Sequence, residues 1–204
     1  MDKDKLLTNC SLTIGNYSKM ADRLEQRNNI SQFLLIYYGL VGIIDALLYR
    51  YFDLQNIIPT LACDVFEFWD ILIAIVMLVF SFEIALLKYP ERVKLCIKSL
   101  NTLKHLKSKI SIAKDIDVLL DEYYETVSNI DFLFTRTDFY YSCKEYDNRH
   151  SSDELKKHFR RFEILTINLR VFLENLLYVL LMAMPIVMYV FLFFVSKNAL
   201  FGTK

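Results

Sequence analysis

Five polar residues lie inside or at the ends of three apolar blocks of this 204-residue chain. An ionisable group at the centre of a membrane-spanning helix costs at least about 2.5–3.5 kcal/mol, so such a group usually faces a partner helix or water. In an oligomer, repeated carboxylates form rings that line cation-conducting paths. These residues are therefore candidate pore-lining or interhelix polar groups: Asp45, Asp70, Glu83, Glu174 and Asn175.

Simpler structural roles remain open for the same residues. Asp70 and Glu174 can lie at the membrane interface, and Asp45 can pair with Arg50 or with an outer-leaflet neighbour. Pro185 lies in the middle of the third apolar block and is a candidate gating hinge. An isolated proline is nevertheless well tolerated in a membrane-spanning helix, so a hinge is not required by its presence.

The remaining residues lack the motifs of an enzyme or a metal site. The four cysteines form no CxxC pair, and the three histidines fit no metal-binding helix spacing. The sequence also has no Gly-rich phosphate-binding loop and no nucleophile elbow. We therefore expect no catalytic residue, no cofactor and no bound metal.

The composition places these polar residues in a membrane. Hydrophobic residues make up 54% of the chain and the mean hydropathy is +0.28, which is more apolar surface than one water-facing globule of this size can bury. The apolar excess falls at about 33–52, 69–87 and 176–195, each close to the roughly 20 residues that a helix needs to cross a bilayer. The sequence predicts an all-α membrane protein with a two-span hairpin and a third, C-terminal span.

Basic residues near the span ends predict the orientation. Residues 33–87 hold one basic residue against six acidic ones, whereas residues 88–170 hold sixteen against thirteen. Lys and Arg concentrate on the cytoplasmic side of membrane proteins. We therefore expect an N-terminal cytoplasmic helix (1–32), a transmembrane hairpin (33–87), a cytoplasmic helical region (88–170) and a C-terminal span with its tail (171–204).

Helical periodicity predicts a long arm after the second span. Apolar residues recur at helical spacing from about 91 to 130, with a break near Ser111–Asp115. Residues 129–150 predict a turn with short elements, and a further helix begins near Ser151 or Ser152 and runs directly into the third span. That helix carries a basic run expected to face anionic lipid: Lys156, Lys157, Arg160 and Arg161.

Two stretches carry a resemblance to a known family. The segment NYSKMADRLEQRNN, with Ala21, Arg23 and Leu24, precedes the first span, and the two spans lead into the long arm. This layout resembles the SLATT family of bacterial conflict-system effectors. The later stretch DEYYETVSNIDFLFTRTDFYY is similar to a region of the SLATT branch that accompanies reverse transcriptases. It holds Tyr123, Tyr124, Asn129 and Asp138, whereas Ile130 stands where that branch often has histidine.

The resemblance implies a function in antiviral defence. It predicts a homo-oligomer in the bacterial inner membrane, assembled through its arms, that forms pores and causes abortive infection when an operon-encoded partner senses invasion. That partner would be a sensor or an enzyme, such as a nucleotide synthase or a reverse transcriptase.

Other functions remain possible on the sequence alone. A non-conducting membrane anchor that scaffolds a cytoplasmic partner enzyme fits the arm equally well. A small transporter is less favoured because inverted repeats are lacking. Direct nucleic-acid binding is disfavoured because the net charge is zero.

Overall fold

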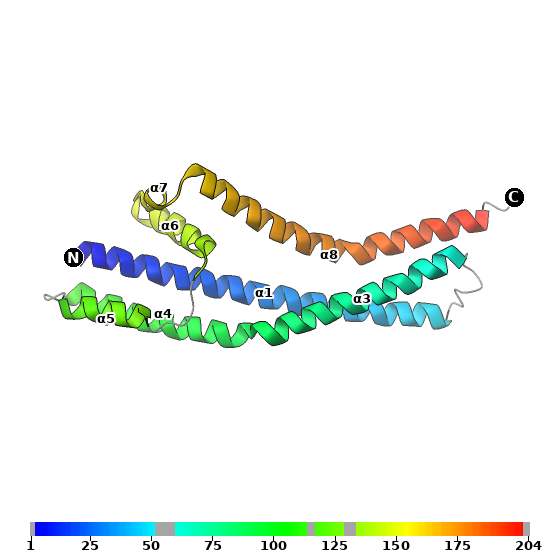
Figure 1. Cartoon of the computed structure of the whole chain (residues 1–204), viewed down its shortest axis with the longest axis horizontal. Helices are drawn as coiled ribbons and strands as arrows, with labels where there is room; N and C mark the ends of the chain where they lie inside the picture. Colours follow the sequence, from blue (N-terminus) through cyan, green and yellow to red (C-terminus); the bar gives the residue numbers. More distant parts are fainter. Residues whose placement is uncertain (1–2, 52–59, 114–116, 129–133, 202–204) are drawn as a thin grey trace. The chain divides into compact units, whose positions relative to one another are not determined.

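The computed structural model describes residues 3–51, 60–113, 117–128 and 134–201, and these ranges contain helices and no strand. The helices follow one another along the chain as shown in Figure 1: α1 (Lys3–Tyr51), α3 (Thr60–Leu87), α4 (Tyr89–Ile112), α5 (Asp117–Ser128), α6 (Arg136–His150), α7 (Glu154–His158) and α8 (Arg161–Phe201).

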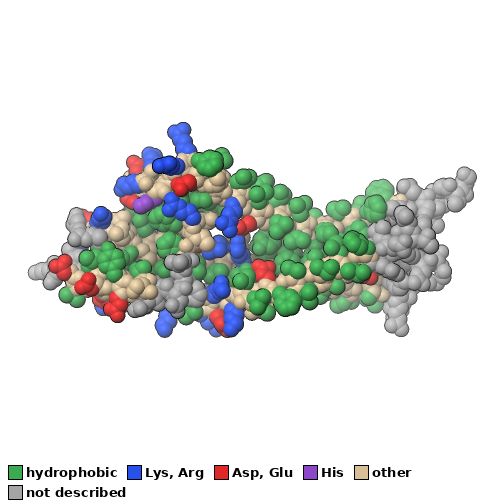
Figure 2. Space-filling view, in the orientation of Figure 1, with side chains coloured by type: hydrophobic (Ala, Val, Ile, Leu, Met, Phe, Trp, Pro, Cys, Tyr) green, Lys and Arg blue, Asp and Glu red, His purple; other side chains and the backbone are tan. Residues whose placement is uncertain are grey.

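The helices form two compact units. The arm unit comprises Met1–Asn28 and Lys88–Leu169, and the apolar unit comprises Asn29–Leu87 and Arg170–Lys204. Helices α1 and α8 contribute residues to both units. Charged side chains gather over the arm unit, whereas hydrophobic ones cover α3 and the visible face of α8 (Figure 2).

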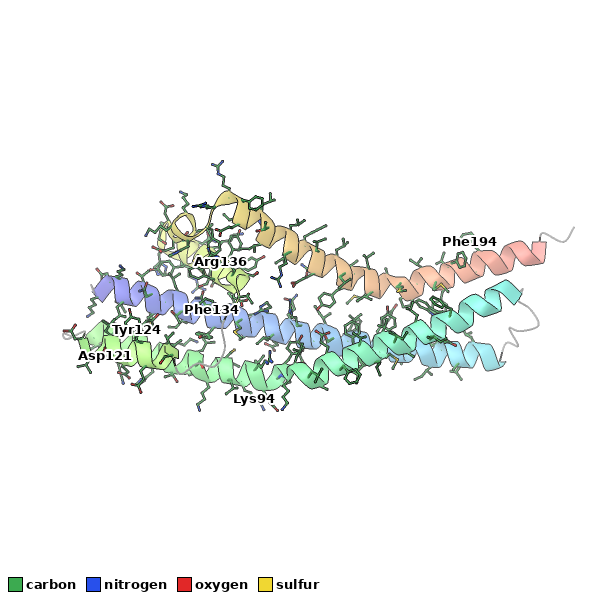
Figure 3. All side chains as sticks on the ribbon, viewed as in Figure 1. Lys94, Asp121, Tyr124, Phe134, Arg136 and Phe194 are labelled. Atoms are coloured by element: carbon green, nitrogen blue, oxygen red, sulfur yellow. The ribbon has the colours of Figure 1, made fainter. Side chains whose placement is uncertain are left out.

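The apolar unit packs α1, α3 and α8 around a small core. Its buried residues are Leu34, Tyr38 and Val41 from α1 and Trp69, Ile73 and Phe80 from α3. Side chains of α8, including Leu181 and Met188, pack against them. Many other large apolar side chains of these helices are more than half exposed, as expected for lipid contact; Phe194, labelled in Figure 3, is one of them.

Three segments are long and apolar enough to cross a membrane: Lys3–Leu48, Phe68–Ile112 and Arg161–Phe191. This finding confirms the predicted all-α class and the three apolar helices. Helix α1 continues without interruption from the polar N-terminal segment through the first apolar block. Helix α3 begins at Thr60, before the start predicted at 69.

The buried face of α1 has a regular period. One row of its buried residues follows alternating spacings of three and four positions, apart from one half-buried step at Arg27: Leu6, Cys10, Thr13, Tyr17, Met20, Leu24, Ser31, Leu34, Tyr38, Val41 and Asp45. Leu12, Asn16 and Ala21 are also buried and widen this face in the arm unit. This spacing belongs to a helix that packs along one seam against other helices. Asp45 therefore occupies a seam position of α1.

The apolar stripe predicted for the arm is covered within the chain. Helix α4 buries Cys96, Leu100, Leu103, Leu106 and Ile110. The Cys10 thiol on α1 lies 3.7 Å from the carbonyl oxygen of Leu103, and the Lys3 ammonium donates to two carbonyls at the end of α4. A cation there is favourable because a helix C-terminus carries partial negative charge.

The break in the arm is confirmed, with one part outside the described residues. Helix α4 ends at Ile112, and Ala113 has extended backbone (φ −67°, ψ 145°). Helix α5 begins at Asp117. The predicted cap, Asp115, lies outside the described residues.

The prediction of short elements over 129–150 is wrong for its described part. Residues Arg136–His150 form one regular 15-residue helix, α6. Thr135 and Asp138 form a capping box, in which each side chain accepts a backbone N–H of the other residue. This reciprocal cap stabilises the start of α6. The helix was not predicted because the aromatic residues of this stretch follow no helical spacing.

The predicted continuous helix from Ser151 or Ser152 into the third span is also wrong. Ser151 has left-handed backbone (φ 50°) and ends α6. Asp147 accepts hydrogen bonds from the N–H groups of Glu154 and Leu155, which starts the short α7 separately. Phe159 is extended, so the third span begins as a new helix at Arg161.

Candidate functional site

The carboxylate of Asp45 is fully buried in the apolar unit. It is 0% exposed, and its Oδ1 accepts a 2.6 Å hydrogen bond from the hydroxyl of Tyr189 on α8. This bond joins α1 and α8, which are both long and apolar enough to cross a membrane, through residues that are 144 positions apart in sequence. A buried carboxylate needs such a partner because desolvation of the charge is costly.

Two further polar groups lie close to this bond. The indole of Trp69 on α3 faces the Asp45 carboxylate, and Asp70 is close enough to interact electrostatically with Tyr189. The Trp69 Nε1 and the Asp45 Oδ2 are buried and reach hydrogen-bond geometry with no described residue. The structure thus gathers polar groups of all three helices of the apolar unit around Asp45.

Pro185 creates a second polar contact between α1 and α8. A helical proline has no N–H, so the carbonyl four residues earlier, that of Leu181, loses its helical donor. The hydroxyl of Tyr38 donates to this carbonyl oxygen at 2.7 Å, and the hydroxyl of Tyr37 donates to the next carbonyl, of Met182, at 3.1 Å. Neighbouring helices commonly satisfy carbonyls that a proline frees in a membrane. Pro185 is buried, and α8 bends partway along its length (Figure 1).

The other candidate residues occupy more exposed positions. Asp70 and Asn175 are exposed, whereas Glu83 is half-buried. Glu174 pairs with Arg170 one helical turn earlier at 3.2 Å. Of the five candidates, therefore, Asp45 alone is buried in the described residues, whereas Asp70 and Asn175 are open to the surroundings of a single chain.

A charged contact joins α1 to α6 in the arm unit. The guanidinium of Arg23 donates two 2.9 Å hydrogen bonds to the carboxylate of Asp138, whose side chain is 2% exposed. The same carboxylate accepts from the Thr135 N–H at 2.8 Å. On the same pair of helices, a 2.6 Å bond from Lys19 lowers the pKa of Glu145.

The basic run borders an open depression of about 670 Å³ in the arm unit. Its lining includes Lys156, Lys157 and Arg160 together with Arg136, which is labelled in Figure 3. Arg136 stacks over the ring of Phe159, with its guanidinium carbon 4.4 Å from the ring centre. Glu163 is also part of the lining, and Lys156 and Lys157 pair with Asp153 and Glu154. An anionic ligand or an acidic protein partner would have to compete with these carboxylates.

The distance along α8 from the basic run to the uncharged block is relevant to the predicted contact of that run with lipid. Arg161 comes 15 residues before Leu176, where the uncharged block begins, which is roughly 22 Å along α8. The headgroup layer extends only about 5–8 Å beyond the hydrocarbon. Arg161 thus lies farther from the uncharged block than the headgroup layer extends beyond the hydrocarbon.

The described cysteines are structural. Cys10, Cys96 and Cys143 are buried free thiols, and Cys63 lies outside the residues whose side chains are described. Burial raises the pKa of Cys10 to about 11 and that of Cys143 to about 12, so both stay protonated at neutral pH. No cluster of His, Cys, Asp and Glu suited to a metal occurs among the described residues.

The sequence pattern does not predict the tyrosines that join these helices. Tyr37, Tyr38 and Tyr189 lie within apolar blocks, where nothing in the local sequence indicates a polar contact. One signal was available for α1, because Tyr38 and Asp45 share the seam that begins at Leu6. Their partners on α8, the Leu181 carbonyl that accepts from Tyr38 and the Tyr189 hydroxyl that donates to Asp45, have no comparable signal in the sequence.

Comparisons with known proteins place the chain in a family. A comparison with curated proteins and one with solved structures find no match. The sequence model of the SMODS and SLOG-associating 2TM effector domain family 5, one of the SLATT families, matches residues 2–195. This match confirms the SLATT resemblance and includes α8 up to Val195, beyond the two spans named in the family description. The chain belongs to the SMODS and SLOG-associating 2TM effector domain family.

Proposed function

We propose that this protein is an oligomeric effector that permeabilises the bacterial inner membrane when a partner sensor detects phage infection. The observation that carries the proposal is the buried Asp45 carboxylate bonded to Tyr189 across two membrane-spanning helices. Purely apolar helices would anchor a protein at lower cost. The family match supports a membrane effector in a defence system.

Contacts within the arm unit support the topology that we propose. Arg23 and Lys19 form ion pairs with α6, so the N-terminal segment and residues 88–169 share one side of the membrane. The bias of Lys and Arg makes that side the cytoplasm. Helix α1 then crosses outward, α3 crosses back, and α8 carries the C-terminus outward.

In this proposal the described chain is a closed, resting subunit. Asp45 faces Tyr189, and the carbonyls around Pro185 are satisfied by Tyr37 and Tyr38. In an assembly, the exposed Asp70 and Asn175 and the half-buried Glu83 and Glu174 would supply polar surface to a shared path. Activation would bring these residues of neighbouring subunits together.

Ion flux from liposomes tests the proposal. We expect purified protein, reconstituted with its activated partner, to release potassium and dissipate an imposed potential. Glu83→Gln should reduce flux at least threefold with normal insertion, whereas Glu91→Gln, an exposed acid at the start of α4, should not. The absence of flux together with an intact membrane potential on induction would contradict pore formation.

A non-conducting anchor is the alternative function, and the basic depression favours it. Arg136, Lys156, Lys157 and Arg160 surround a surface that fits an acidic partner in the cytoplasm. Under this alternative, an operon-encoded enzyme such as a nucleotide synthase or a reverse transcriptase would co-purify with the chain. Charge reversal of Lys156 and Lys157 would release that enzyme, and neither the original chain nor the variant would conduct ions.

A further inference from the structure

The first part of α8 has two apolar faces. Over residues 161–175, one face is turned into the arm unit, where Ile164 and Ile167 pack with Phe159. Polar strips containing Glu163 and Thr166 on one side and Asn168 on the other separate it from the second face. A helix with one apolar face is explained by packing within its own chain, but a second face requires another partner.

The second face is exposed. Four of its large side chains, which we call the α8 seam, are all more than half exposed: Phe162 75%, Leu165 63%, Leu169 53% and Phe172 61%. Leu173, which is 53% exposed, lies beside them at the edge of the same face. Their spacing of three, four and three residues is that of positions a and d in a heptad repeat. A lipid environment requires no such period, whereas a second helix does.

Most of the α8 seam precedes the uncharged block of α8 that is expected to lie in the hydrocarbon. Phe162 precedes the uncharged block at Leu176 by 14 residues, which is roughly 21 Å of helix. The charged pair Arg170–Glu174 lies between them. In a single subunit, most of the α8 seam would therefore be exposed to water, and a contiguous apolar surface of this kind marks an interaction site.

We propose that the α8 seam packs against the same seam of a second copy of this chain, in parallel and in register. Membrane insertion fixes every copy in one orientation, so identical residues come to the same depth without further constraint. The polar residues that flank the seam over Leu165–Phe172, Thr166 and Asn168, are uncharged and exposed, so two identical helices approach without like-charge repulsion. This assembly surface rests on the oligomeric part of the proposed function.

The arm itself offers less surface for this contact. Its stripe from Leu100 to Ile110 is buried within the chain, whereas the α8 seam is uncovered. Assembly would thus use the cytoplasmic start of α8 and leave α4 packed in its own subunit. The seam also leads directly along α8 toward Pro185, so subunit contact and the bend lie on one helix.

Disulfide cross-linking in native membranes tests the α8 seam. In a Cys63→Ser background of the full chain, we expect Leu165→Cys and Leu169→Cys to form covalent dimers under mild oxidation. The matched control is Arg170→Cys, which is adjacent to Leu169 and exposed but turned about 100° away around the helix. Dimer should form at least tenfold faster at 169 than at 170; equal rates would overturn the proposal.

Charge complementation provides a second test that does not depend on thiols. Leu165→Glu and Leu165→Lys should each lower the oligomeric fraction at least tenfold, because like charges would then face each other. Co-expression of the two variants with different tags should restore assembly and yield mixed oligomers. Unchanged assembly of either variant alone would overturn the proposal.

The outcomes separate this contact from pore formation. Cross-linking at 165 and 169 without ion flux would support the α8 seam and contradict the pore. Ion flux with no cross-link at either position would overturn the α8 seam and leave the pore proposal standing.

Discussion

The Tyr38 hydroxyl donates a 2.7 Å hydrogen bond to the Leu181 carbonyl, the carbonyl that Pro185 deprives of its helical donor. The proline and the tyrosine are thus complementary, although they lie on different helices. A bend in α8 is tolerated inside an apolar unit because α1 supplies the missing donor.

A double-mutant cycle tests this complementarity. Tyr38→Phe should lower the unfolding free energy in micelles by about 1 kcal/mol because it leaves a buried carbonyl unsatisfied. In a Pro185→Ala background the residue at 185 again donates to Leu181, so the same substitution should cost less than half as much. Tyr37→Phe is the control, because Met182 can still accept from the N–H of Ile186. Equal costs in both backgrounds would show that the two residues are independent.

The Asp45–Tyr189 bond gives a second prediction. Tyr189→Phe should destabilise the protein by about 0.6–1.7 kcal/mol, which are the average and the maximum measured for hydrogen bonds between membrane helices. In an Asp45→Leu background it should cost almost nothing, because the acceptor is already lost. Denaturation in mixed micelles measures both values. If Asp45→Asn reduces ion flux without any change in unfolding, Asp45 lines the path and does not mainly join helices.

The Arg23–Asp138 pair should dominate the stability of the arm unit. Arg23→Ala leaves the buried Asp138 carboxylate without its cation, and removal of one partner of a buried pair costs about 3–5 kcal/mol. Arg23→Lys should be only a partial rescue, because lysine cannot make both hydrogen bonds. Limited proteolysis and thermal unfolding report the loss. Lys19→Ala, which removes the more exposed pair with Glu145, should cost less than 1 kcal/mol and serves as the control.

The buried thiols predict a dependence on alkaline pH. Burial raises the pKa of Cys10 from 9.0 to about 11 in the folded chain, so the folded state keeps a proton that the unfolded state loses. The stability is therefore fully present below pH 9 and declines as the pH rises from 9 toward 11. Cys10→Ala should flatten this decline in a pH series of thermal unfolding. Cys10 and Cys143 should also resist maleimide at pH 7.5 until the chain unfolds.

Much of the fold was predictable from local pattern. The three apolar blocks, the break after Ile112 and the all-helical class follow from hydropathy and helical spacing, which depend on neighbouring residues alone. The start of α6 and the separate α7 were not predicted. Each of these helices starts where a carboxylate, that of Asp138 or Asp147, accepts backbone N–H groups. The local sequence does not show whether such a residue starts a new helix or lies inside a longer one.

The sequence alone determined which residues are costly in a membrane, because the price of a charge in lipid does not depend on the fold. The cost of a buried charge identified Asp45 as a residue to explain, and the missing N–H of a helical proline identified Pro185. Only the tertiary structure decided their partners. Tyr189 is 144 positions from Asp45, and Tyr38 is 143 positions from Leu181, so no local pattern links the members of either pair. Packing of α8 against α1 selects them, because a buried polar group must find its hydrogen bond on whichever helix lies beside it.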